Sequence, residues 1–410
     1  MKSFEIPSIF KSDTIAKIKN FRRENDKLKR NFEPTILDFG PIKFLIARHF
    51  GFCYGVENAI EIAYKAIAEN QYKRIFLLSE MIHNPEVNAD LLDRGVKFIL
   101  DTKGNQLINW AEIQENDIVI VPAFGTTVEI QNILKSRGID PYLYDTTCPF
   151  VEKVWKKANQ IGAQDYTIIV HGKPKHEETR ATFSHSQVGA PTLVIKDIDE
   201  AIILGKFINN QIDITEFEKY FSNRFSSDFD PKIHLQKLGV VNQTTMLASE
   251  TQAISDYLKN ILIEKYNLVK GNIQNHFADT RDTLCYATND NQNATMALLK
   301  YEADFAIVAG GYNSSNTSHI VELCESIFPT YFIETQEKVI NENEILHFDL
   351  HEKCEKITLD YLPKKETTTI ILTCGASCPD SVVEGILTKF LGFFPNCTAI
   401  DIVMDNLLTK

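Results

Sequence analysis

Short apolar runs rich in β-branched residues alternate with helical patterns from about residue 43 onward, and this alternation restricts the possible folds more than any other feature of the chain. Strands are predicted at KFLIA, RIFLLS, DIVIVPAF, YTIIVHG, KLGVVNQ, ADFAIVAGG and TTTIILTCG. Each run ends in a polar or glycine-containing turn, and then meets a helical pattern such as VENAIEIAYKAI. This order is typical of parallel strands that are joined by crossover helices. The sequence therefore predicts an α/β fold with mainly parallel sheets.

Two segments depart from this alternation. Residues 1–42 lack it and are predicted to form a helical N-terminal extension, whereas residues 206–237 are polar and irregular enough to be an insertion. The repeated units indicate similar α/β modules, although no sequence repeat is strong enough to prove a duplication. The length of 410 residues is sufficient for two or three domains.

The charge balance argues against two classes of partner. The chain has 55 acidic and 43 basic residues and a formal net charge of -12, which disfavours general binding to nucleic acid or to an anionic membrane. No apolar run is as long as a membrane span, and residues 1–30 lack the apolar core of a secretory signal. We therefore expect a cytoplasmic protein with no nucleic-acid or membrane partner. The net charge does not exclude local basic pockets for an anionic substrate.

Polar and sulfur-containing residues gather in the turns that follow the predicted strands. In open α/β sheets, ligands bind at the carboxyl ends of the strands, so these turns are the expected place for chemistry. In chain order the turns carry Cys53, His83 with Asn84, Cys148, residues 171–178, Thr244 with Thr245, Cys285, residues 313–316, and Ser377.

Three cysteines share one placement. Cys53, Cys148 and Cys285 each follow a short turn and immediately precede a helical pattern. At such a place the helix dipole and the free backbone N–H groups favour a thiolate, which can ligate a metal. An isolated cysteine is more often a small buried apolar residue, but the same unusual placement at three positions favours ligands. The chain's eight cysteines are also too scattered for the disulfide framework of a small secreted domain.

The spacing of these cysteines does not choose the metal. Zinc sites generally use close pairs such as C-x2-C, whereas the ligands of an iron–sulfur cluster can converge from separate domains. With three thiolates, a four-iron cluster would keep one iron without a cysteine, and that iron could bind a substrate oxygen as a Lewis acid. The C-x3-C pair of Cys374 and Cys378 is interpreted as part of a turn of small residues, and Cys324 as a core residue.

The polar turns offer acid–base and anion-binding groups. His176 and Glu178 place an imidazole next to a carboxylate, which suits proton delivery, although such a pair also occurs as a surface hydrogen bond. GGYNSSNTSH, NQTTM and GASCPD are rich in hydroxyl and amide donors, as helix caps and phosphate sites are. Three such turns at strand ends point to an oxyanion or diphosphate pocket. No G-x-G-x-x-G follows a strand and no Walker A sequence occurs, so a dinucleotide or nucleoside triphosphate is not supported.

Eight motifs together resemble the 4-hydroxy-3-methylbut-2-enyl diphosphate reductase family, also called the IspH or LytB family. They are GFCYGVENAI, IHNPEVN, DTTCP, HGKPKHEETRAT, NQTTM, CYAT, NSSNTSH and GASCPD, in the order of the family, and they cover about residues 43–390. The resemblance implies three similar α/β domains around one central [4Fe-4S] cluster. The expected bounds are 43–147, 148–284 with the insertion, and 285–390, with a C-terminal tail at 391–410.

The resemblance also implies a role for individual residues. Cys53, Cys148 and Cys285 would hold the cluster, and the iron not bound by cysteine would bind the substrate hydroxyl. Glu178 would deliver protons with the help of Thr244. The residues implied in holding the diphosphate, or lying close to it, are His83, His176, Gln243, Thr245, Ser314, Ser315, Asn316 and Ser377.

The implied reaction is the last step of the non-mevalonate isoprenoid pathway. Two electrons from a ferredoxin or flavodoxin, together with protons, would remove the hydroxyl of (E)-4-hydroxy-3-methylbut-2-enyl diphosphate as water. The products would be isopentenyl and dimethylallyl diphosphate. Two alternatives remain: a non-redox hydro-lyase that uses the open iron only as a Lewis acid, and a non-enzymatic iron–sulfur sensor.

One position departs from many bacterial members of the family. They have a histidine before the glycine of the second strand-end turn, whereas this chain reads VPAFGTTVE, with Phe124. The plant and cyanobacterial branch shares the phenylalanine, the HEET spelling, the insertion before NQTTM and an N-terminal extension. The resemblance is therefore to that branch. The phenylalanine removes one potential phosphate donor, and it can equally serve packing.

Overall fold

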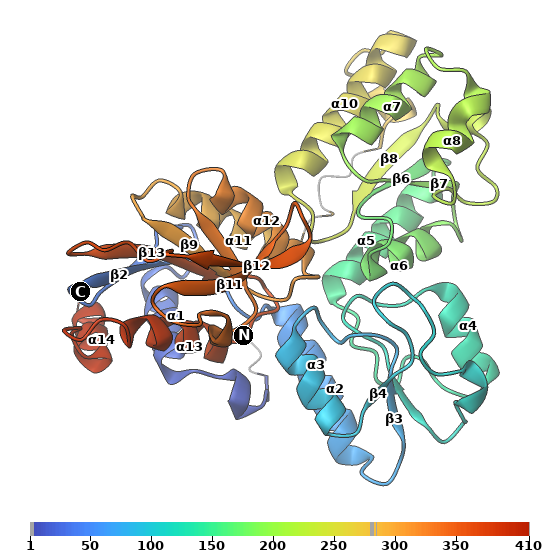
Figure 1. The fold of residues 1–410 in the computed structure, drawn as a ribbon. Coiled ribbons are helices and arrows are strands. Elements are labelled where there is room, and N and C mark those ends of the chain that lie inside the picture. The colour runs from blue at the N-terminus through green and yellow to red at the C-terminus, as the bar shows by residue number, and fades with distance from the viewer. Residues whose placement is uncertain (1–3, 279–282, 284, 410) are drawn as a thin grey trace. The chain divides into compact units, whose positions relative to one another are not determined.

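Three β-sheets form the frame of the structure, a computed structural model that describes residues 4–278, 283 and 285–409 (Figure 1). The chain divides into two compact units. Unit 1 comprises residues 1–57, 82–90 and 286–410, and unit 2 comprises residues 58–81 and 91–285. Each unit has its own sheets and its own core, and each is described by itself.

Unit 1 is built on a seven-stranded sheet in the order β1-β2-β13-β9-β10-β11-β12. Its strands are β1 (Thr35–Asp38), β2 (Ile42–Ile46), β9 (Phe305–Ala309), β10 (Thr330–Ile333), β11 (Glu344–Asp349), β12 (Cys354–Leu359) and β13 (Thr368–Cys374). The four strands β2, β13, β9 and β10 run parallel, and β1, β11 and β12 add antiparallel edges. The central strands are buried on both faces, as continuous apolar runs such as FAIVA predict.

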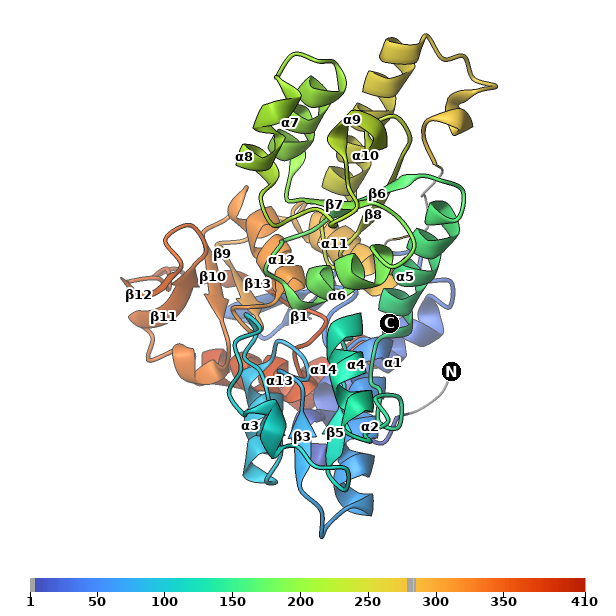
Figure 2. The same cartoon turned by 90° about the vertical axis from the view of Figure 1, so that its right-hand side faces the viewer.

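Helices cover both faces of this sheet. Figures 1 and 2 show α11 (Tyr286–Leu298) and α12 (Ser315–Glu325) on one face, and α1 (Asp13–Asn25), α13 (Asp380–Leu391) and α14 (Ile400–Leu408) on the other. The apolar side chains between these layers form one core, to which α1 contributes Ile15 and Ile18 and α14 contributes Val403 and Met404. The termini of the described chain therefore take part in the core of unit 1.

Unit 2 contains two parallel sheets of three strands each. The first has the order β4-β3-β5, with β3 (Ile75–Leu77), β4 (Lys97–Phe98) and β5 (Ile118–Ile120). Leu134 and Ile130 of α4 (Val128–Ser136) pack against Phe76 and Val119 of this sheet. The helices α2 (Tyr54–Glu69) and α3 (Pro85–Asp93) each contribute residues to both units.

The second sheet of unit 2 has the order β7-β6-β8, with β6 (Thr167–His171), β7 (Thr192–Ile195) and β8 (Leu238–Asn242). All three strands are fully buried. Figures 1 and 2 show α7 (Ile198–Ile208) and α10 (Ala248–Tyr266) on one face, and Figure 1 shows α5 (Pro149–Gly162) and α6 (Glu177–Ser186) on the other. The short helices are α8 (Phe217–Phe221), α9 (Pro231–His234), η1 (Ser8–Phe10), η2 (Trp110–Glu112), η3 (Ile214–Glu216), η4 (Ile273–Asn275) and η5 (Gln336–Lys338).

The predicted α/β fold with mainly parallel sheets is confirmed, and every strand that the sequence predicted is present. The predicted helix within residues 1–42 is α1, but β1 in the same segment pairs with β2. Strand β2 joins the sheet of residues 305–374, not one within residues 43–147. The division into three domains stays a prediction, and residue 284, at one of its boundaries, lies outside the described residues. Within the described part of the chain, no helix is both long and apolar enough to cross a membrane.

Candidate active site

The three cysteines singled out by the sequence each stand immediately before a helix. Cys53 precedes α2, Cys285 precedes α11, and Cys148 is the N-cap residue of α5, with Pro149 as its first residue. Cys53 and Cys148 are half-buried and Cys285 is buried, and all eight cysteines of the chain are thiols. The predicted placement at helix starts is therefore confirmed.

Backbone hydrogen bonds hold two of these cysteine turns to neighbouring strand ends. In unit 1 the N–H of Cys53 donates to the carbonyl of Ala376 over 3.1 Å, and in unit 2 the N–H of Cys148 donates to the carbonyl of Ala123 over 3.0 Å. Cys285 belongs to unit 2 with Cys148, whereas Cys53 belongs to unit 1. Across the described residues, no three His, Cys, Asp or Glu side chains form a group that could hold one metal ion. Binding of one cluster by all three cysteines stays a prediction.

Three of the remaining five cysteines have the environments of core residues. Cys324, Cys374 and Cys378 are fully buried in the apolar core of unit 1. Burial raises the pKa of the Cys378 thiol well above its usual value, and burial raises the pKa of Cys324 to about 12. A thiol that keeps its proton is a poor metal ligand. These environments support the interpretation of Cys324 as core and of Cys378 as a non-ligand.

In unit 1, the start of α12 presents the hydroxyl and amide groups of NSSN. Ser314 is the N-cap residue, and its Oγ accepts a hydrogen bond from the N–H of Thr317 over 3.2 Å. Ser315 and Asn316 are only 3% and 4% exposed, yet Ser315 Oγ and Asn316 Oδ1 have no hydrogen-bond partner among the described residues. A buried polar atom without a partner is costly, so these atoms are ready to bind a polar ligand.

Two further segments of unit 1 meet this helix start. Ser377, in the turn after β13, donates from Oγ to the carbonyl oxygen of His83 over 3.2 Å. A Cβ atom at Gly311, in the turn after β9, would collide with the same carbonyl oxygen. Because β9 and β13 are parallel neighbours, their carboxyl ends lie side by side. The structure thus brings together the predicted diphosphate residues of unit 1: His83, Ser314, Ser315, Asn316 and Ser377.

In unit 2, Glu178 is held at the start of α6. It is 1% exposed, and its carboxylate accepts hydrogen bonds from both the N–H and the hydroxyl of Thr244, the latter over 3.0 Å. His176 is the N-cap residue of the same helix, and its Nδ1 accepts from the N–H of Glu178 over 3.2 Å. The imidazole of His176 and the carboxylate of Glu178 are therefore held at one helix start, and the hydroxyl of Thr244 donates a hydrogen bond to that carboxylate.

Gln243 is committed to the turn itself. Its Oε1 accepts from the hydroxyl of Thr179 over 3.0 Å and from the N–H of Lys173 over 3.1 Å, and its Nε2 donates to Thr245 Oγ1 over 2.7 Å. Gln243 therefore fixes the turns after β6 and β8 to each other, which the sequence did not reveal.

The turn that carries Phe124 also packs on this group. The rings of Phe124 and His176 meet edge to face, with centroids 5.6 Å apart and planes at 84°. The preceding residue, Ala123, is the one that binds the N–H of Cys148. Phe124 thus contacts one of the proposed site residues directly, which supports the interpretation that its ring serves packing.

Sequence reasoning missed two threonines that support the site. Thr288 Oγ1 lies 3.5 Å from Asn316 Nδ2, and Thr317 Oγ1 donates to Ser314 Oγ over 2.9 Å. Thr288 is the last residue of CYAT, one helical turn after Cys285 and buried, and that spacing was the available signal.

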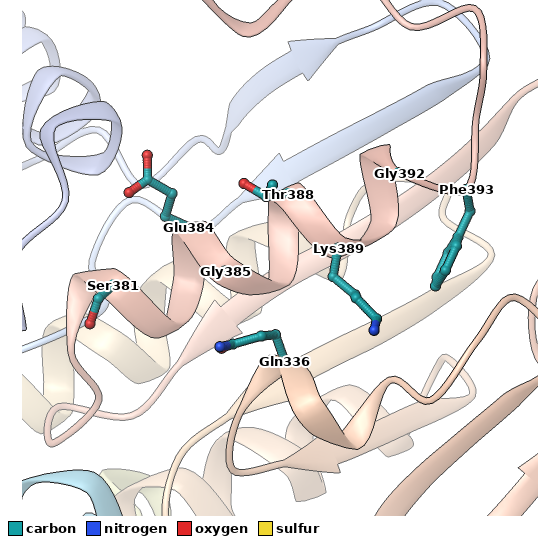
Figure 3. Close-up of a pocket in the computed structure, with 8 residues that line it drawn as sticks. All are labelled: Gln336, Ser381, Glu384, Gly385, Thr388, Lys389, Gly392 and Phe393. Carbon is teal, nitrogen blue, oxygen red and sulfur yellow. The ribbon is translucent and has the colours of Figure 1, made fainter.

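A pocket of about 630 Å³ elsewhere in unit 1 contains none of the predicted site residues. It is lined by the outer face of α13 and by Gln336 of η5, and Figure 3 shows the side chains of Gln336 and Lys389 between these two helices. Its lining offers no thiol and no imidazole. The chemistry suggested by the sequence therefore lies at the strand ends and not in this pocket.

Comparison with known proteins adds a family assignment to this geometry. The family model described as LytB protein matches residues 44–391. A curated relative from Prochlorococcus marinus strain MIT 9313, named 4-hydroxy-3-methylbut-2-enyl diphosphate reductase, is 39% identical over 357 residues, which cover 87% of each chain. A relative of the same name from Microcystis aeruginosa strain NIES-843 is 36% identical and covers 94% of this chain and 90% of its own.

Two solved structures are similar in fold. A structure of (E)-4-hydroxy-3-methyl-but-2-enyl diphosphate reductase, described as the terminal enzyme of the non-mevalonate pathway, is 24% identical with a TM-score of 0.50 and covers 85% of this chain and 99% of its own. The E-1-hydroxy-2-methyl-but-2-enyl-4-diphosphate reductase from Plasmodium falciparum is 21% identical with a TM-score of 0.59 and covers 87% and 89%. At these identities the likeness concerns the fold.

Proposed function

The chain belongs to the LytB protein family, and from this premise we propose that it reduces (E)-4-hydroxy-3-methylbut-2-enyl diphosphate to isopentenyl and dimethylallyl diphosphate, the last step of the non-mevalonate isoprenoid pathway. The substrate takes up two electrons and two protons. The carbon–oxygen bond of its hydroxyl breaks, one proton leaves with that oxygen as water, and the other proton ends on carbon. The observation that carries the proposal within this chain is the buried carboxylate of Glu178 with the hydroxyl of Thr244 on it.

The reaction needs electrons, and the donor set of the chain fits a [4Fe-4S] cluster. The fit rests on the cysteines, because Cys53, Cys148 and Cys285 are thiols that each precede a helix start, where thiolate is favoured. These three residues would hold the cluster. When bound, the cluster would supply electrons and, at the iron without a cysteine, a Lewis acid for the substrate hydroxyl.

The diphosphate would bind at the start of α12. The helix N-terminus favours an anion, and Ser315 Oγ, which has no partner among the described residues, would gain one there. Ser314, Asn316, Ser377 and His83 surround this point within unit 1 and would supply the remaining donors. This arrangement would orient the substrate by its diphosphate end.

Glu178 would hold the proton that the leaving oxygen takes up. The two hydrogen bonds from Thr244 fix the Glu178 carboxylate in place. His176 caps the same helix, because its Nδ1 accepts a hydrogen bond from the N–H of Glu178. A carboxyl that is almost fully buried donates its proton inside a dry site and not to bulk water. Thr244 would place its hydroxyl between this carboxyl and the substrate oxygen, and Gln243 and Thr245 would keep the turn rigid.

The electron donor would be a ferredoxin or a flavodoxin, and the protein would act in the cytoplasm. A small soluble redox protein matches the need for electrons delivered one at a time to an iron–sulfur centre.

One anaerobic experiment tests the proposal. The full chain is reconstituted with iron and sulfide, its visible spectrum is recorded, and reductant and substrate are added while both products are followed. Isopentenyl and dimethylallyl diphosphate are the expected products. A formed cluster without reaction would favour the hydro-lyase or the sensor, and no cluster at all would overturn the ligand assignment.

The variant Glu178→Gln isolates the acid–base step, since the amide has the same shape but no proton to give. We expect turnover to fall by about a hundredfold or more while the cluster spectrum stays unchanged, because positioned proton donors contribute about 10²- to 10⁴-fold. Glu152→Gln changes a half-exposed carboxylate of α5 that pairs with Lys156; it serves as the control and should retain full turnover. Full turnover in Glu178→Gln would remove Glu178 from the mechanism.

A further inference from the structure

The N-terminal extension contacts the turn that carries Cys53. Within unit 1, the ring of Phe4 meets that of Tyr54 edge to face, with centroids 5.0 Å apart. The ring of Phe10 meets that of Phe52 in the same manner at 6.1 Å. The residues on both sides of Cys53 are therefore each packed against an aromatic ring of the extension.

Lys19 of α1 holds the beginning of the same turn. Its Nζ lies 2.6 Å from Asp380 Oδ1, and it lies over the ring of Phe50 at 4.8 Å from the centroid. Gly51 has a φ of +77°, and a Cβ atom there would come within 2.6 Å of Lys19 Nζ and 2.7 Å of Asp380 Oδ1. Only glycine combines this backbone conformation with so close an ion pair.

The extension is anchored well enough to hold the turn. Phe10 is 2% exposed, and Ile15 and Ile18 of α1 are fully buried in the core of unit 1. Asp380 is the first residue of α13, and the turn just before it carries Ala376, which binds the N–H of Cys53. The Lys19–Asp380 ion pair thus links α1 to the start of α13, next to the turn that binds Cys53.

The N-terminal extension also contacts the residue that follows Cys285. Lys29 Nζ lies 5.6 Å from the centroid of the Tyr286 ring, and Tyr286 directly follows Cys285 in the chain. Arg48 pairs with Asp26 over 3.6 Å and is almost fully buried. The same extension therefore reaches the residue after a second proposed ligand.

We infer that residues 4–29, called here the N-terminal brace, position the Cys53 turn for the cluster and cover part of it from solvent. The inference rests on the proposed function, because it takes Cys53 as a cluster ligand. Phe10 and Lys19 are positioning residues: they touch the turn and not the substrate. By lowering the frequency with which residues 50–54 open, the brace would slow the access of oxygen to the cluster.

The test compares matched pairs of full-length variants. Lys19→Met keeps the side-chain length but removes the ion pair with Asp380, and Lys17→Met removes an exposed lysine of the same helix. Phe10→Ala removes the ring on Phe52, and Ile9→Ala truncates a neighbour that is 54% exposed. Each variant is reconstituted anaerobically, its iron and sulfide are counted, and the bleaching of its cluster absorbance in air is followed without substrate.

We expect Lys19→Met and Phe10→Ala to bleach about fivefold faster than the unmodified chain, since local opening sets the rate at which a covered site is reached. Lys17→Met and Ile9→Ala should bleach at the unmodified rate. Equal bleaching of Lys19→Met and the unmodified chain, with equal cluster content, would overturn the brace and leave the proposed function intact. Absence of a cluster in the unmodified chain would instead overturn the proposed function. If Phe10→Ala does not fold, as judged by circular dichroism, Lys19→Met decides the question.

Discussion

Phe124 shows how one aromatic side chain can serve a site without offering it a polar atom. Its ring meets His176 edge to face, and His176 also caps α6 beside Glu178. The imidazole is thereby restrained from two sides, by a hydrogen bond at Nδ1 and by a ring contact. A histidine at position 124 would add a donor but would not necessarily keep this restraint.

We predict that Phe124→Leu weakens substrate binding more than catalysis. Edge-to-face pairs contribute about 0.5–1.5 kcal/mol, so losing the ring should raise KM by about twofold to tenfold and change kcat less. Phe124→Tyr keeps the ring contact and should stay close to the unmodified values. Steady-state kinetics of the reconstituted enzyme measure both constants, and equal KM values in Phe124→Leu and Phe124→Tyr would refute the idea.

His49 gives the stability of unit 1 a dependence on pH. Burial, reinforced by the positive charges of Arg48 and Lys29, lowers the pKa of His49 to about 4. In the unfolded chain the imidazole has its ordinary pKa near ~6.5, so between these values the unfolded state binds a proton that the folded state does not. The free energy of unfolding should therefore rise as pH rises from about 4 to about 6.5 and gain nothing from His49 above that range.

Denaturant unfolding at pH 5 and pH 7 checks this prediction. His49→Gln cannot bind the proton, so the difference in unfolding free energy between the two pH values should shrink relative to the unmodified chain. His351, which is largely exposed, provides the control variant His351→Gln. An unchanged difference in His49→Gln would show that other groups set the pH dependence.

At this scale the sequence predicted the reactive groups better than their neighbours. Cys148 next to Pro149, and His176 before Glu178, could be predicted to lie at helix starts, because a few adjacent residues determine where a helix begins. The contacts of Phe124 with His176 and of Phe10 with Phe52 join residues 52 and 42 positions apart. No local pattern encodes such a contact, and it became visible only in the structure.

Among the elements, the predicted strands are present, but the partners of the first one were not foreseeable. The run KFLIA forms β2, and its neighbour β13 lies more than three hundred residues away, with Phe44 opposite Ile370. Apolar alternation indicates that a strand exists and which faces it buries, but not which strand it joins. For the same reason the extension could be predicted as helical but not as part of the core of unit 1.

The segment 206–237 was also not predictable in full, because its sequence is mostly polar and yet its aromatic side chains form part of a core. Phe217 and Phe221 of α8 are buried against Phe207, and the Phe217 and Phe229 rings stack at 5.4 Å. Widely spaced aromatics in a polar sequence show no helical or strand period. Their burial together depends on the turns between them.

We predict that Phe217→Ala destabilises unit 2 by about 3 kcal/mol or more, because truncating a buried phenylalanine removes apolar contact and leaves a cavity. Ile233→Ala, in the same segment but 60% exposed, should change stability by less than about 0.5 kcal/mol. Denaturant unfolding monitored by circular dichroism separates the two. Similar small losses for both variants would mean that the segment does not pack as a core.

For the molecule as a whole, the residues proposed for the active site are divided between the two compact units. Unit 1 contains Cys53 and five of the residues proposed to hold the diphosphate, namely His83, Ser314, Ser315, Asn316 and Ser377. Unit 2 contains the other proposed residues, namely Cys148, His176, Glu178, Gln243, Thr244, Thr245 and Cys285. Neither unit alone carries a complete set of ligands and acid–base groups. A cluster held by all three cysteines would therefore need ligands from both units.

We therefore predict that binding of the cluster increases the thermal stability of the protein. A group that binds the folded protein but not the unfolded chain stabilises it by mass action, so the reconstituted protein should unfold at a higher temperature than the cluster-free protein. Cys53→Ser and Cys285→Ser, from different units, should each abolish most of this increase. Cys354→Ser, an exposed cysteine of β12, should retain all of it. Anaerobic thermal unfolding measures the increase, and if Cys53→Ser kept it in full, the cluster would be held by unit 2 without help from unit 1.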